Sequence, residues 1–382
     1  MNILIAPDSF KDSLSAMEVC NNIEKGIVRV FPHAEIRKIP LADGGEGTVD
    51  ALVQATKGKK IHAVVHDPLF REITATYGIL GDEKTAVIEM AAASGIELLS
   101  EKERNPWITS TLGTGELIQD ALNNGCRKFI IGIGGSATND GGTGMAVALG
   151  ARFVDVSGND MKGTGENLGK INKIDLNNLD SRINECSISV ACDVTNPLYG
   201  NQGAAYIYSP QKGADEKMVE KLDQNLQHFG QLIEKQIGKE ISLMPGAGAA
   251  GGLGAGLHAF LNATLEPGFK IIKNTLKLDD IMPWADIVIT GEGKIDNQTR
   301  FGKTPHGVAM VAKQKKIPVI ALAGTLGDGY EELYNHHFHA IFSILDKPMK
   351  LDDALKNAPK LLEQTAESIM RMIDITTGKK KS

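Results

Sequence analysis

The chain has 382 residues, of which 42% are apolar and 23% charged, and its formal net charge is −6. This length exceeds that of most single-core domains, so we expect two domains in a globular, water-soluble protein. The negative charge argues against nucleic acid as a partner, because basic residues are scattered except at positions 379–381. No segment approaches the ~20 apolar residues of a membrane helix, so we expect no membrane partner.

The cysteines and the N-terminal segment bear on the compartment. Cys20, Cys126, Cys186 and Cys192 form no C-x-x-C pair, and the apolar start of the chain is too short for a signal peptide. Reduced thiols are the default for such a protein. We therefore predict a cytoplasmic location.

Short apolar runs, each followed by a polar, often glycine-rich loop, recur along the chain. They begin near Asn2, Ile36, Ser187, Asp286 and Pro318. Between them, apolar residues at helical spacing predict helices within residues 15–28, 48–53, 115–122 and 306–313. Strands alternating with helices indicate an α/β chain with largely parallel sheets. Ligands bind beyond the carboxyl ends of such strands, which is where the polar loops fall.

Residues 60–90 have a different pattern. Apolar and polar residues alternate within 61–66, 73–80 and 85–90, with turn residues between them, which predicts an antiparallel meander. We interpret it as the entry into a second domain placed inside the first. The expected division is a discontinuous, Rossmann-like α/β domain of residues 1–60 and 270–382, and an inserted α/β domain with a mixed sheet of residues 61–269. The glycine-rich run 245–256 is the expected hinge near the return.

Residues 129–145 carry the strongest functional signal. An apolar run ends in a loop of Gly, Ser, Thr, Asn and Asp, and helix-forming residues resume at Met145. Free backbone N–H groups and a helix dipole both favour an anion at such a place. We predict that phosphoryl or carboxylate oxygens bind here, through backbone amides and the hydroxyls of Ser136, Thr138 and Thr143.

The same loop also matches the G-x-G-x-x-G/A dinucleotide pattern from Gly132 to Ala137, with Asp155 at a suitable distance for a ribose contact. Residues 246–251 match the pattern too, without a convincing strand before them, so the pattern is weak in this chain. In the first match a polar segment separates the glycines from the helix. A dinucleotide site is therefore the less favoured reading, as is a tight turn without a ligand.

Other phosphate motifs are incomplete. Gly302-Lys303-Thr304 resembles the end of a P-loop, but Asn297 stands where that motif needs glycine. Carboxylates nevertheless recur in the loops that follow strands, although any one of them is most often a solvated residue or a helix cap. They are Asp8, Asp43, Glu46, Asp140, Asp193, Glu292 and Asp296. Phosphoryl transfer from ATP needs Mg²⁺ on one or two carboxylates and a group that orients the attacking hydroxyl, so this set suits that chemistry.

Cations are the second requirement for handling a triphosphate and an anionic acceptor. Lys11, Lys212, Lys294, Arg300 and Lys303 lie in the same loops, and we favour Lys11 and Lys294. For the base we favour Asp193, because it directly follows the apolar run 187–192 and would be fixed at a strand end. Its alternative role is an Asx-turn into Asn196-Pro197.

Taken together and in this order, these stretches resemble the bacterial glycerate kinases of the type 1 family. The resemblance covers nearly the whole chain. Asp12 departs from the pattern, since glycine is expected there. The matching segments are residues 5–16, 40–48, 111–116, 132–145, 191–198, 210–214, 245–254 and 290–296.

The resemblance implies ATP-dependent phosphorylation of D-glycerate, usually to 2-phosphoglycerate and in some members to 3-phosphoglycerate. It also implies two α/β domains with the active site in a cleft between them. It assigns no catalytic residue. The oligomeric state, monomer or homodimer, stays open.

The predicted roles therefore rest on residue chemistry, for a direct in-line transfer from Mg-ATP. Asp193 is the expected base, and Lys11, Asp43 and Asp296 complete the catalytic set, with Asp43 and Asp296 also as metal ligands. The remaining assignments are Gly134, Gly135, Ser136, Thr138 and Lys294 for ATP, and Asp8, Ser9, Lys11, Asn139 and Asp140 for glycerate. An NAD-dependent dehydrogenase of a small hydroxy acid and a non-catalytic sugar-acid-binding protein stay open as alternatives.

Overall fold

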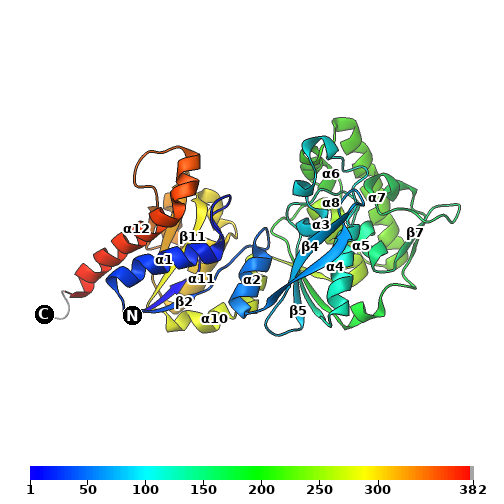
Figure 1. The fold of residues 1–382 in the computed structure, drawn as a ribbon. Coiled ribbons are helices and arrows are strands. Elements are labelled where there is room, and N and C mark those ends of the chain that lie inside the picture. Colours follow the sequence, from blue (N-terminus) through cyan, green and yellow to red (C-terminus); the bar gives the residue numbers. More distant parts are fainter. Residues whose placement is uncertain (379–382) are drawn as a thin grey trace. The chain divides into compact units, whose positions relative to one another are not determined.

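The computed structural model describes the backbone of residues 1–378 and the side chains of residues 1–375 (Figure 1). The basic residues 379–381 lie outside this range. The chain divides into two compact units. Unit 1 comprises Met1–Asp43, Asp50–Thr56 and the described residues from Ile272 onward, and unit 2 comprises Gly44–Val49 and Lys57–Ile271. These units are defined by contacts within the chain, so the domain boundaries at residues 60 and 270 remain a prediction.

Unit 1 is built on a five-stranded, entirely parallel sheet with the order β13-β12-β11-β1-β2. Its strands are β1 (Asn2–Ile5), β2 (Glu35–Lys38), β11 (Ile287–Ile295), β12 (Val319–Leu326) and β13 (Ala340–Ser343). Its main helices are α1 (Ala16–Val30), α10 (Leu278–Ile281), α11 (Thr304–Lys315) and α12 (Leu351–Gly378), while α2 (Thr48–Thr56) and α9 (Gly268–Thr275) have residues in both units.

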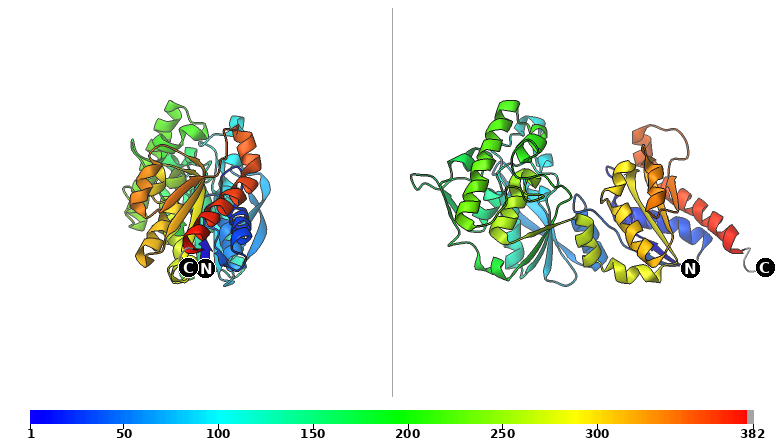
Figure 2. Two further views of the ribbon diagram at one scale, coloured as in Figure 1. Left: turned by 90° about the vertical axis from the view of Figure 1, so that its left-hand side faces the viewer. Right: turned by 180° about the vertical axis from the view of Figure 1, so that it is seen from behind.

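Helices α1 and α12 lie side by side in all three views (Figures 1 and 2). Both pack on the sheet face formed by Ile3, Ile5 and Ile289, while Leu4 and Val288 point to the opposite face and are also buried. The sequence predicts α1 from its apolar spacing, and Ser15 and Glu18 add a capping box at its start. The predicted helix is thus confirmed.

Asp12 lies in the loop before α1 and has a φ of +62°. Glycine adopts this left-handed backbone conformation without the steric cost that a Cβ atom brings, and Asp is among the residues that tolerate it. The expectation of glycine at this position therefore has a backbone cause, and Asp12 adopts the conformation that glycine favours.

Unit 2 contains a six-stranded mixed sheet with the order β10-β9-β6-β5-β4-β3, and a separate two-stranded sheet of β7 and β8. The strands are β3 (Lys59–His66), β4 (Glu72–Ile79), β5 (Thr85–Glu89), β6 (Lys128–Gly132), β7 (Arg152–Val154), β8 (Lys173–Asp175), β9 (Ser187–Ala191) and β10 (Thr264–Glu266). The helices are α3 (Ala91–Ser94), α4 (Leu112–Asn123), α5 (Thr143–Ala148), α6 (Ala204–Tyr208), α7 (Glu216–Ile237) and α8 (Ala249–Leu261).

The pairings confirm the predicted meander, because β3–β4 and β4–β5 are antiparallel, whereas β5, β6, β9 and β10 run parallel. The fold is thus mixed α/β with mostly parallel sheets, as predicted. No helix among residues 1–378 is long and apolar enough to cross a bilayer.

The expected hinge at residues 245–256 is wrong. The run lies inside unit 2, and from Gly246 onward it is buried. Gly251 has a φ of +68°, its carbonyl accepts a hydrogen bond from Gly141 N at 3.0 Å, and a Cβ atom there would lie 2.0 Å from Thr138 O. Its glycines therefore allow the close packing of α8 behind the loop that follows β6.

Candidate functional site

In unit 1, the strand order reverses between β1 and β11. Open parallel sheets bind ligands at this switch point, beyond the carboxyl ends of the strands. Asp8 and Ser9 follow β1 there, and Glu292 lies in the second half of β11. The structure thus brings Asp8 and Ser9 to the edge where a ligand is expected.

The Asp8 carboxylate accepts two hydrogen bonds, and the backbone N–H of Asp8 makes a third contact. Thr304 Oγ1, at the start of α11, donates to Asp8 Oδ2 at 2.6 Å, and Ser9 N donates to Oδ1 at 2.6 Å. Asp8 N in turn donates to Gly291 O of β11 at 2.8 Å. The side chain is therefore fixed in one orientation at the switch point.

Negative charge accumulates around Asp8. Burial, together with the nearby charge of Asp43, raises the pKa of Asp8 to about 7. Burial also raises the pKa of Glu292, whose oxygens accept from Thr299 Oγ1 at 2.6 Å and pair with Lys303 Nζ at 3.4 Å. The cluster of Asp8, Asp43 and Glu292 thus favours a bound proton or cation.

The raised pKa of Asp8 makes stability depend on pH. The pKa of this carboxyl is near 3.9 when the chain is unfolded and about 7 when it is folded, so the contribution of Asp8 to stability is fully present below pH 4 and is lost as pH rises through 7. In the variant Asp8→Asn this loss disappears, while Thr304 can turn its hydroxyl to accept. We expect the variant to be about 2 kcal/mol more stable at pH 8 and little changed at pH 4, because partial exposure screens the full effect.

Urea denaturation at the two pH values measures this difference. Asp12→Asn is the control, because it removes an exposed carboxylate from the same loop region and Asn tolerates a positive φ. An equal gain in both variants, or none at pH 8 for Asp8→Asn, would contradict the assignment.

Lys294 lies near the end of strand β11, Asp296 directly follows the strand, and both have local partners. Asp296 Oδ2 pairs with the exposed Lys294 Nζ at 3.0 Å, and Oδ1 accepts from Gln298 N at 2.9 Å as the cap of the 3₁₀ helix η7 (Asn297–Arg300). Burial alone would raise the pKa of Asp296, but these hydrogen bonds lower it. Asp296 thus has a helix-capping function that the sequence did not distinguish from metal binding.

Lys11 is exposed on the loop after β1. The part of the chain with described side chains contains no group of three or more His, Cys, Asp or Glu residues that could hold a metal. Mg²⁺ in kinases uses only one or two carboxylates together with phosphates and waters. The charge crowding of Asp43 and Asp8 fits such a cation, whereas both oxygens of Asp296 are already engaged.

In unit 2, the loop after β6 has an exposed rim and a buried base. Gly134 and Gly135 are exposed, whereas residues 136–146 are buried. Ser136 Oγ and Thr138 O both accept hydrogen bonds from Lys212 Nζ at 2.7 Å. Helix α5 begins only at Thr143, after the polar segment, so the glycines of the dinucleotide pattern do not open the helix.

Asp140 and Asn139 are fully buried, which argues against the predicted contact with substrate. Asp140 Oδ2 accepts from Thr111 N and Oγ1 at 2.8 Å and from Gly144 N at 3.1 Å, and Oδ1 accepts from Gly142 N at 3.1 Å. It joins the N-termini of α4 and α5. We reassign Asp140 to a structural role, with its oxygens already used.

Asp193 follows β9, as the sequence predicts, and is exposed. Its Oδ1 accepts from Gly268 N at the first residue of α9, at 3.1 Å. This bond orients the carboxylate at the strand end and leaves it accessible. The placement is compatible with a base and with a capping function.

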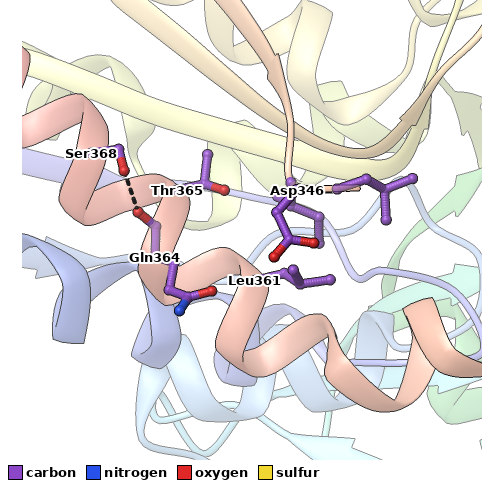
Figure 3. A pocket seen from close by; sticks show the side chains of 7 residues that line it. Asp346, Leu361, Gln364, Thr365 and Ser368 are labelled. Carbon is purple, nitrogen blue, oxygen red and sulfur yellow. Dashed lines mark hydrogen bonds between the residues drawn. The ribbon is translucent and has the colours of Figure 1, made fainter. Parts of the chain in front are cut away.

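A shallow pocket in unit 1 lies between α12 and the segment after β13 (Figure 3). None of the predicted site residues lines it, and its only charged side chain is Asp346. It lacks the cations that an anionic substrate requires. Its lining residues are Ile344, Leu345, Asp346, Leu361, Gln364, Thr365 and Ser368.

The sequence did not single out two residues that the structure places at these clusters. Thr304 holds Asp8, and Lys212 lies beneath the loop after β6. The incomplete P-loop motif contains Thr304, but the motif predicts a phosphate contact instead of a carboxylate contact. Lys212 was one of five candidate cations, without a feature that marked it as buried.

Asp155 is used within its own turn between β7 and β8. Its carboxylate accepts from Ser157 N at 2.8 Å and Asn159 N at 2.9 Å, and from Asn159 Nδ2 at 3.0 Å. These donors use most of the acceptor positions that a ribose would need. The dinucleotide alternative thus loses its acidic residue.

Comparisons with known proteins agree with the sequence resemblance. Residues 3–374 match the model of the glycerate kinase family. The chain is 51% identical to a glycerate kinase from Halalkalibacterium halodurans, over 96% of this chain and 97% of that protein. It is also 51% identical to the glycerate 2-kinase of Escherichia coli K12, over 94% of each. A crystal structure from Salmonella typhimurium LT2, of a protein assigned as glycerate kinase 2, matches with a TM-score of 0.91 and 47% identity over 99% of both chains.

Proposed function

Because the chain belongs to the glycerate kinase family, we propose that it transfers the γ-phosphoryl group of ATP to D-glycerate, giving ADP and 2-phosphoglycerate. The observation that carries the proposal is near-full-length similarity to a relative named glycerate 2-kinase. The family assignment confirms that the protein is an enzyme of this family and disfavours the dehydrogenase and binding-protein alternatives. The cytoplasmic location and the oligomeric state stay predictions.

The donor phosphates are assigned to the loop after β6. Gly134 and Gly135 leave backbone accessible there, and the Ser136 hydroxyl is beside them. A phosphate can accept hydrogen bonds from such groups without reorganisation of the loop. Gly134, Gly135 and Ser136 are therefore the proposed ATP contacts. Thr138 is buried, and its carbonyl accepts a hydrogen bond from Lys212.

Asp193 of unit 2 is assigned as the base, and the residues at the unit 1 switch point are assigned to the polar groups and charges of the substrates. The glycerate 2-hydroxyl oxygen forms the new bond to the γ-phosphorus, the bond from phosphorus to the ADP oxygen breaks, and the hydroxyl proton passes to Asp193. Asp8 and Ser9 are assigned to the polar groups of glycerate, and Lys11 and Lys294 to carboxylate and phosphate charge. Mg²⁺, held by Asp43 together with phosphates, would supply charge neutralisation.

A coupled assay of ADP release with glycerate, tartronate and other small sugar acids tests the proposal, and NMR of the product identifies the phosphorylated oxygen. We expect D-glycerate to be the preferred acceptor and phosphate to appear on O2. Phosphate on O3 would correct the position. Absence of glycerate-dependent ADP release, or protection against unfolding by NAD(H) but not by Mg-ATP, would overturn the kinase assignment.

Lys11→Ala should reduce kcat/KM for glycerate by about tenfold or more, through a higher KM or a lower rate, because a charge-assisted contact with the carboxylate is lost. Steady-state kinetics with glycerate varied at saturating ATP measure the effect. Lys356→Ala, an exposed lysine on α12 of the same unit, is the control. Identical kinetics in both variants would remove Lys11 from the site.

A further inference from the structure

Lys212 is a fully buried lysine whose amine is directed at the loop after β6. It ends the 3₁₀ helix η5 (Pro210–Lys212), and its Nζ donates to Ser136 Oγ and Thr138 O, both at 2.7 Å. Lysine is rarely fully buried unless paired, and among the residues with described side chains the hydrogen-bond partners of Lys212 Nζ are a hydroxyl and a carbonyl, not a carboxylate. The position therefore calls for a reason beyond packing.

The hydrogen bond to Lys212 determines how Ser136 can act. A serine hydroxyl has one proton and two acceptor positions. Because Ser136 Oγ accepts from Lys212, its own proton remains to be donated elsewhere. The exposed Gly134 and Gly135 directly precede it, so an anion at this rim would receive that proton in a hydrogen bond.

The surroundings of Lys212 are short of compensating charge. Burial lowers the pKa of Lys212 to about 7, and only the buried Asp140 acts in the opposite direction. In the segment that Lys212 and Ser209 contact, Thr138 Oγ1 and Asn139 Nδ2 are buried without a hydrogen-bond partner among the described residues. An anion at the loop would restore the balance, because it favours the charged ammonium.

A second contact ties the same segments together. Ser209 Oγ, directly before η5, donates to Asn139 Oδ1 at 3.1 Å. Residues 209–212 thus hold residues 136–139 at two points, one neutral and one cationic. Only the cationic contact can affect the affinity of the loop for an anion by its charge.

We propose that Lys212 is a positioning residue for the donor nucleotide, which orients the Ser136 hydroxyl toward the phosphates and places a buried positive charge beneath the loop. The proposal rests on the proposed kinase function. It predicts a defect in nucleotide handling rather than in glycerate handling, since Lys212 acts through the phosphate loop.

The variant Lys212→Met keeps the length and apolar stem of the side chain and removes the amine. We expect the KM for ATP to rise about tenfold or more, with the KM for glycerate changed less than about twofold. Calorimetric titration with Mg-ADP should show a matching loss of affinity without any turnover. Lys239→Met is the control, because Lys239 Nζ also donates to two carbonyls in unit 2, those of His258 and Ala259, but at the end of α8.

A double-mutant cycle with Ser136→Ala tests whether Lys212 acts through that hydroxyl. We expect Ser136→Ala alone to raise the KM for ATP. The double variant should have an ATP KM close to that of the more impaired single variant, since both substitutions remove the same contact. Additive effects would overturn the proposed path, as would an unchanged ATP KM and Mg-ADP affinity in Lys212→Met. If Lys212→Met does not fold, the ATP KM of Ser136→Ala tests the proposal, and an unchanged value overturns it.

Failure of this proposal is distinguishable from failure of the kinase assignment. Wild-type protein that phosphorylates glycerate, with variants unaffected in ATP KM, removes only the role of Lys212. Wild-type protein without glycerate-dependent ADP release removes the kinase function, whereas the Mg-ADP titrations still report on the loop.

Discussion

Replacing Asp193 with Asn should lower kcat by about 100-fold or more and change the KM for ATP little. Asn keeps the shape and can still accept the hydrogen bond from Gly268 N, but it cannot take the proton of the attacking hydroxyl. A loss confined to kcat is the signature of an interaction made in the transition state. Steady-state kinetics with both substrates varied separately measure it.

Asp223→Asn provides the matched control. The Asp223 carboxylate also accepts a hydrogen bond from a backbone N–H in unit 2, that of Gly200, at 2.8 Å. Asp223 lies on α7 and is not one of the proposed site residues. We expect near-normal turnover in this variant. Near-normal turnover in Asp193→Asn as well would remove Asp193 as the base and leave it as a residue that caps the start of α9.

The elements were predictable where the sequence pattern is local. Apolar spacing predicts α1, and alternation predicts the meander of β3, β4 and β5, because each pattern follows directly from helix or strand geometry. The order of the unit 1 sheet was not predictable in this way. β1 pairs with β11, which begins at Ile287, and no local pattern encodes so distant a partner.

The glycine-rich run 245–256 shows how composition can mislead. Glycine is common in hinges, but it is also required where backbones approach closely. Gly251 meets the second need, because its φ is positive and Thr138 O lies where a Cβ atom would be. The sequence contains the glycine but not the neighbour that requires it.

Lys212 and Asp140 illustrate the same limit for charged residues. Their charges predict exposure or a ligand contact, whereas both are fully buried. Burial of a charged group depends on partners from other segments, here the loop after β6 for Lys212 and Thr111 for Asp140. The sequence therefore identified the loop as important without separating the residues that bind from those that hold it in place.

Asp140→Ala should destabilise the protein by about 3–5 kcal/mol, because it leaves buried donors on Thr111, Gly142 and Gly144 without an acceptor. The loss would separate the N-termini of α4 and α5. Chemical denaturation followed by circular dichroism measures it. Asp155→Ala is the matched control, since Asp155 also accepts several hydrogen bonds but in an exposed turn, and its loss should cost less than about 1 kcal/mol.

The comparison separates a structural role of Asp140 from substrate contact. A residue that binds glycerate would lose activity on truncation while unfolding at nearly the wild-type denaturant concentration. Truncation of a residue that joins two helix N-termini would lower the denaturant concentration at the unfolding midpoint. If Asp140→Ala were as stable as Asp155→Ala but inactive, Asp140 would return to the substrate site. Because all four of its hydrogen bonds come from buried donors, we expect stability to fall first.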